Sequence, residues 1–166
     1  MYKEPRLPQN AKEGIIFMLI ISIISVNTIA PMIMFLERGF SWQTYKEALA
    51  IIPIMWIVVL ILVRFVAGPV VGKVLPKFVG KTDGFNSRVL WNIILNVTTL
   101  SLLLTIIGSW IGMREISLYP IENFFHIWPR NFGIALWIEA LIAQPIARFA
   151  MKQIHARQDR KAAAQA

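Results

Sequence analysis

Long apolar stretches without charged side chains constrain this chain more than any other feature of its sequence. Residues 14–36 contain no charged side chain over 23 positions, and residues 89–113 contain none over 25. Each stretch exceeds the roughly 20 helical residues that are needed to cross a hydrocarbon core. Apolar residues make up 57% of the whole chain, whereas soluble domains usually contain about 45–50%. We therefore expect lipid, not water, around the helices.

Two further apolar stretches each carry one ionisable side chain. Residues 48–71 are interrupted only by Arg64, and residues 131–147 only by Glu139. An ionisable group inside a membrane span is costly, so such groups face protein or a cavity. The chain is therefore predicted to be an all-α, polytopic membrane protein with four transmembrane helices.

The two halves of the chain resemble each other at an offset of 76 residues, which is the separation of Pro53 from Pro129. The same offset aligns four further pairs: Ser25 with Ser101, Asn10 with Asn86, Ser41 with Ser117 and Pro69 with Pro145. Such internal similarity indicates a duplication. Each unit is then a helical hairpin, and the two tandem hairpins form an antiparallel up-down-up-down bundle.

The repeat predicts the domain boundaries. The first two-helix module is residues 1–75, with spans at about 14–36 and 53–73. A cytoplasmic linker, residues 76–88, leads to the second module, residues 89–154, with spans at about 89–113 and 129–149. A basic tail, residues 155–166, follows. Pro53 and Pro129 are expected in the first turn of a helix. Pro69 and Pro145 fall inside spans, where kinks are expected.

Lysine and arginine are distributed unevenly between the predicted loops. The N-terminal tail, residues 73–88 and residues 148–161 together hold twelve, whereas the other two loops hold four. By the positive-inside rule both termini are cytoplasmic. The net charge of +8 then faces anionic lipid headgroups. No nucleic-acid-binding motif accompanies it, so nucleic acid is not an expected partner.

Polar side chains deep in the predicted spans form the candidate binding site. Arg64 and Glu139 each lie nine positions before the basic residue that ends the span, and Asn96 lies eight positions after Arg88. At 1.5 Å per residue, all three lie about 12–14 Å from the cytoplasmic boundary. We therefore expect an Arg64–Glu139 ion pair, bridged by Asn96. The full candidate set is Arg64, Glu139, Asn96, Asn92, Asn27 and Gln144.

Two interpretations of this cluster stay open at the level of sequence. It is either a site that handles a proton or a small solute, or a buried clasp that fixes how the hairpins dock. No serine-nucleophile, metalloprotease or phosphate-loop motif is present, and the chain has no cysteine, so neither an enzyme nor a cofactor is expected.

The paired modules resemble a bacterial family of small two-helix membrane modules of unknown function that often occur in tandem. The resemblance rests on Lys12, Ser25, Asn27, Pro53 and Ala67-Gly68-Pro69 in the first unit, and on Arg88, Ser101, Pro129 and Ala143-Gln144-Pro145 in the second. It implies a bacterial inner-membrane location and assigns no activity.

The functional expectation is accordingly an integral inner-membrane protein. Its first alternative is transport of a small solute or proton, for which a homodimer is favoured because four helices enclose little volume. Its second alternative is a non-transporting structural subunit that docks another membrane protein through faces of small residues.

Overall fold

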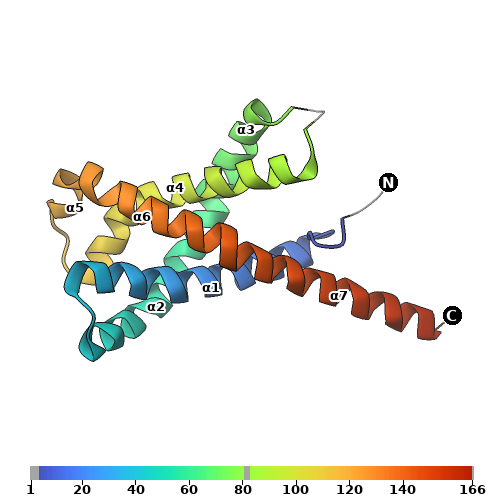
Figure 1. Ribbon diagram of the computed structural model, residues 1–166, viewed down its shortest axis with the longest axis horizontal. Helices are drawn as coiled ribbons and strands as arrows, with labels where there is room; N and C mark the ends of the chain where they lie inside the picture. Colours follow the sequence, from blue (N-terminus) through green and yellow to red (C-terminus); the bar gives the residue numbers. More distant parts are fainter. Residues whose placement is uncertain (1–3, 81–82, 166) are drawn as a thin grey trace.

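The computed structural model describes residues 4–80 and 83–165, and within those ranges the secondary structure is helical (Figure 1). The elements are α1 (Ala11–Arg38), α2 (Trp42–Leu62), the π-helical turn η1 (Val63–Ala67), α3 (Gly68–Phe78), α4 (Phe85–Met113), α5 (Tyr119–Glu122), α6 (Phe124–Ile138), the π-helical turn η2 (Glu139–Ala143) and α7 (Gln144–Gln165).

Four of the resulting helices are long and apolar enough to cross a membrane. They are Ala11–Arg38, Trp42–Phe78, Phe85–Met113 and Phe124–Arg160, which confirms the predicted number of spans. Large apolar side chains cover their outer surfaces, and Phe65 and Trp137 are both about two-thirds or more exposed. Such an outward apolar face suits surroundings of lipid.

The second and fourth helices begin earlier than the sequence predicted. The Ser41 hydroxyl accepts a 3.0 Å hydrogen bond from the Thr44 backbone N–H, so it caps α2 at Trp42. This side-chain cap satisfies a free N–H of the first turn and starts the helix eleven residues before Pro53. Pro53 and Pro129 consequently lie inside α2 and α6, and the prediction of both in a first helical turn is wrong.

The two π-helical turns end two residues before Pro69 and Pro145, the prolines that were expected to kink the spans. The N–H of Gly68 donates to the carbonyl of Val63, and the N–H of Gln144 donates to the carbonyl of Glu139, both across five residues. Proline lacks an N–H and clashes with the carbonyl four residues earlier. The wider turn relieves that clash, and it recurs 76 residues later along the chain.

The long helices pack around a central cleft. Helix α1 contacts α2 and α6, and α4 contacts α2 and α6 on the other side (Figure 1). Two indole N–H groups join neighbouring helices: Trp56 Nε1 donates to Ser22 Oγ at 2.9 Å, and Trp128 Nε1 donates to Ser101 Oγ at 3.0 Å. Each bond holds a helix of one half against the next helix of the same half.

Candidate functional site in the central cleft

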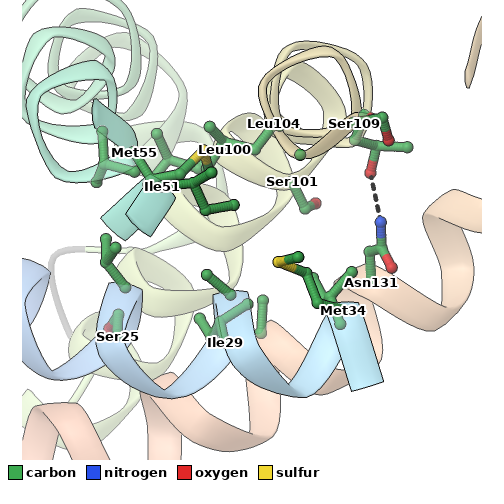
Figure 2. Close-up of a pocket in the computed structure, with 18 of the residues that line it drawn as sticks. Ser25, Ile29, Met34, Ile51, Met55, Leu100, Ser101, Leu104, Ser109 and Asn131 are labelled. Atoms are coloured by element: carbon green, nitrogen blue, oxygen red, sulfur yellow. Dashed lines mark hydrogen bonds between the residues drawn. The ribbon is translucent and has the colours of Figure 1, made fainter. Parts of the chain in front are cut away.

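The cleft between the long helices has a volume of about 160 Å³. Figure 2 shows its walls: Ser25, Ile29 and Met34 come from α1, Ile51 and Met55 from α2, Leu100, Ser101, Leu104 and Ser109 from α4, and Asn131 from α6. Aliphatic side chains form most of the lining, and hydroxyl and amide groups are spaced between them. Glu139 at the start of η2 supplies a carboxylate to the same cleft.

Two neighbouring groups hold the Glu139 carboxylate. The buried Ser25 hydroxyl of α1 donates to Glu139 Oε2 at 2.6 Å. This bond joins the first and the fourth of the membrane-length helices. Gln144 Nε2 donates a longer bond of 3.4 Å to Oε1. A π turn brings residues five apart to the same side of a helix, so η2 places Gln144 over Glu139. The turn therefore determines the direction of the carboxylate.

Arg64 does not join this group, and the predicted ion pair with Glu139 is wrong. Arg64 lies in η1, its side chain is exposed, and it makes no ion pair or hydrogen bond with the described part of the chain. The neighbouring Ala67 is fully buried. In an α-helix these two residues, three apart, would share a face. The π turn separates the two faces, so Ala67 points inward and Arg64 outward.

The amides of the predicted site have three different positions. Asn96 lines the cleft, and its Nδ2 donates to the Asn92 carbonyl at 2.9 Å and to Asn92 Oδ1 at 3.1 Å. Asn92 thus orients Asn96 from within the same helix. Asn27 is exposed and donates to the carbonyl of Ile23 at 2.7 Å. The structure therefore places Glu139 and Asn96 in the lining of one cleft, with Gln144 bonded to Glu139, and leaves Asn27 outside the cleft.

Several polar lining residues escaped the sequence prediction. Thr105 and Asn131 are both buried, and Asn131 Nδ2 donates a 3.4 Å bond to Thr105 Oγ1. A dashed line leaves the Asn131 amide nitrogen in Figure 2. Ser101 was recognised only as part of the repeat. The sequence spacing could have predicted this polar face, since Ser101, Thr105 and Ser109 recur every four residues and thus share one face of a helix.

A network of charged side chains lies at the end of the cleft that is farther from Glu139. Arg38 pairs with Glu47 of α2 at 2.8 Å and donates to the Gly112 carbonyl of α4 at 2.8 Å. Arg130 of α6 pairs with Glu37 of α1 at 2.7 Å. Because Glu37, Arg38 and Gly112 also line the cleft, these contacts join all four helices across its mouth. Each pair is about one-third exposed and adds little to the free energy of folding.

A second buried polar contact lies near the opposite end of the helices. His155 Nε2 is 3.0 Å from Glu13 Oε2, and His155 Nδ1 is 2.7 Å from the carbonyl of Pro5. A carbonyl oxygen only accepts, so Nδ1 must donate. The remaining ring nitrogen faces a carboxylate, so one proton is shared between His155 and Glu13. The N-terminal segment is thereby attached to α7.

The same N-terminal segment also touches the start of α4. The Arg6 guanidinium lies 5.6 Å from the centre of the Phe85 ring, within the range of a cation–π contact. Arg6 Nε also donates to Glu4 Oε1 at 2.6 Å, and this hydrogen bond lowers the pKa of the Glu4 carboxyl. Residues before α1 therefore bridge α7 and α4.

Comparisons with models of known protein families, with curated proteins and with solved structures found no match. Within residues 4–80 and 83–165, no three histidine or carboxylate side chains come together in a way that could hold a metal ion.

Proposed function

We propose that this chain is an integral membrane protein that moves a small solute or proton through the central cleft, with Glu139 as its charged binding group. One observation carries the proposal: a carboxylate held by Ser25 at 2.6 Å lines a cleft of about 160 Å³ between four membrane-length helices. Ionisable groups inside a bundle commonly mark the path of an ion or a proton.

The proposal includes a topology. We place both termini in the cytoplasm of a bacterial cell and the protein in its inner membrane, as two tandem hairpins, because lysine and arginine gather in the tails and in the middle loop. The charged network of Glu37, Arg38 and Arg130 then lies at the outer face. Glu139 would be reached from outside when this network opens, and from the cytoplasm through the region that the N-terminal segment bridges.

Proteoliposomes test the transport proposal. We would measure proton flux, and uptake of a panel of small cationic, anionic and neutral solutes, for the wild type and for Glu139→Gln. Glu122→Gln is the matched control, because Glu122 is an exposed carboxylate of α5 outside the cleft. We expect a flux that Glu139→Gln abolishes and Glu122→Gln preserves. An absent flux would refute transport, and a flux that is equal in all three proteins would refute the role of Glu139.

The alternative function, a subunit that docks onto another membrane protein, has support from Arg64. This side chain is exposed in the middle of the second span, beside exposed Gly68 and Gly72. Leaving an arginine in the hydrocarbon costs about 2.5–3.5 kcal/mol on insertion scales, so a neighbouring helix that carries an acid would stabilise it. Small residues four apart permit the close approach of such a helix.

Cross-linking in membranes tests this alternative. A cysteine at position 72 would be the sole thiol of the chain, and a Cβ added there meets nothing within 4 Å. We expect Gly72→Cys, labelled with a photoactivatable thiol reagent, to cross-link to a helix of another chain and Arg64→Ala to reduce the yield. Docking is refuted if the protein stays monomeric in both forms.

A further inference from the structure

The charge of the cleft lining restricts the class of solute. Three charged side chains line the cleft: Glu37, Arg38 and Glu139. Glu37 is paired with Arg130 and Arg38 with Glu47 at the mouth, whereas no cation contacts Glu139 within the described part of the chain. The interior thus presents one carboxylate without a countercharge. An anionic solute would add a second negative charge in a medium of low dielectric constant.

We propose that the solute is a small alkylammonium ion, whose charge neutralises Glu139 and whose alkyl groups contact the aliphatic walls. This inference rests on the proposed function of the cleft and names the substrate class of that site. Six aliphatic side chains make up much of the wall: Val26, Ile29, Ile33, Met55, Leu100 and Leu104. Such a lining packs well against the C–H groups of a solute, and it has no hydrogen-bonding groups for water molecules bound to an ion.

The same lining argues against a metal ion as the solute. Calcium takes six to eight oxygen ligands, and magnesium takes a near-ideal octahedron of oxygens. Around Glu139 the side-chain partners are one hydroxyl, which already donates to the carboxylate, and one amide nitrogen. These two groups and the carboxylate supply fewer oxygen ligands than either metal ion takes. An organic cation requires only the single negative charge and apolar contact.

The volume of the cleft sets an upper limit on the size of the ion. A cavity of about 150 Å³ lined by aliphatic and aromatic residues holds a molecule the size of benzene, and this cleft measures about 160 Å³. Tetramethylammonium and choline are of that order. Tetraphenylphosphonium, with four aromatic rings, exceeds it several-fold and should be excluded.

The test compares choline with 3,3-dimethylbutan-1-ol, its uncharged isostere, which has the same number of non-hydrogen atoms. Binding to the purified protein in lipid nanodiscs would be measured by calorimetry for the wild type, Glu139→Gln and the control Glu122→Gln. We expect choline to bind at least about tenfold more tightly than the isostere, and this ratio to fall to near one in Glu139→Gln. Tetraphenylphosphonium should not displace choline.

Two further variants keep the outcome interpretable. Glu139→Asp retains the charge, so it should retain the preference for choline even if Glu139→Gln folds poorly. Leu100→Ala enlarges the cleft, so it should admit tetraethylammonium more tightly than the wild type does. Equal binding of choline and the isostere, or a preference unaffected by Glu139→Gln, overturns the inference.

Failure of this inference is distinguishable from failure of the proposed function. Proton flux, or uptake of a neutral or anionic solute, that depends on Glu139 without choline binding would leave the transport proposal standing and reject the alkylammonium ion. Absence of both any Glu139-dependent flux and choline binding would reject the two together.

Discussion

Replacing Ser25 with alanine tests whether Glu139 is held as a carboxylate in the cleft. The Ser25 Oγ to Glu139 Oε2 distance is 2.6 Å, within the range of about 2.5–2.7 Å for a hydroxyl that donates to a charged oxygen. Hydrogen bonds to charged groups contribute about 1.5–3 kcal/mol, and neutral ones about 0.5–1.5 kcal/mol. Ser25→Ala should therefore lower the free energy of unfolding by about 1.5–3 kcal/mol.

The predicted repeat supplies a matched control at the equivalent position. The Ser101 hydroxyl accepts from Trp128 Nε1 at 3.0 Å and donates to the Thr98 carbonyl at 3.1 Å, so both its partners are neutral. Ser101→Ala should cost about 0.5–1.5 kcal/mol. The comparison separates the effect of losing a buried serine hydroxyl from the effect of losing a bond to a charge.

A double-mutant cycle isolates the interaction itself. In the Glu139→Gln background the partner of Ser25 is neutral, so Ser25→Ala should cost only about 0.5–1.5 kcal/mol, and the coupling energy should be about 1 kcal/mol or more. Reversible unfolding in mixed micelles at pH 8, followed by the fluorescence of the six tryptophans, gives each value. Equal costs of Ser25→Ala in both backgrounds would refute the charged hydrogen bond.

Four further predictions concern sites away from this bond. Arg64→Leu should leave the free energy of unfolding of the isolated protein unchanged or raise it, since Arg64 has no partner within the described chain; a loss above about 1 kcal/mol would show a hidden ion pair. Arg38→Ala should speed the labelling of Ser109→Cys by a water-soluble thiol reagent by up to about fivefold, because the ion pairs at the mouth are each worth only about 0–1 kcal/mol; an unchanged rate would mean that they do not control entry. Glu13→Gln and His155→Ala should each lower the melting temperature more than the corresponding change at an exposed site, and the double variant should lower it by less than the sum of the two, because the two side chains share one proton. Reporter fusions should place both termini in the cytoplasm, and an external C-terminus would contradict the proposed topology.

The sequence predicted the number of membrane spans and their approximate places because hydropathy alone determines them. It misplaced the start of α2, because the cap at Ser41 is a local hydrogen bond that begins the helix eleven residues before the first proline of the span. Hydropathy does not register such a bond. The apolar pattern marks where a helix meets lipid and not where it begins.

The candidate site was predicted in part, and its error has a definite physical cause. The levels of Glu139 and Asn96 along their spans were enough to select them, and Gln144 was selected for its place beside Pro145. The direction of Arg64 was wrong because an ionisable group in a span was expected to face protein, whereas the π turn changes which side chains share a face. The charged mouth was missed because Glu37, Arg38 and Arg130 were counted only as loop charges.

The π turn before Pro145 makes the orientation of the Glu139 carboxylate depend on a proline six residues away along the chain. A proline inside a regular helix costs about 3 kcal/mol, so the surplus residue of the turn stays confined to positions 139–143. Replacing Pro145 with alanine to straighten the helix would allow the π turn to become a regular α-helical turn. The preceding segment would then rotate by about 100° per residue lost, and the acid would leave its serine partner although no atom of either had been altered.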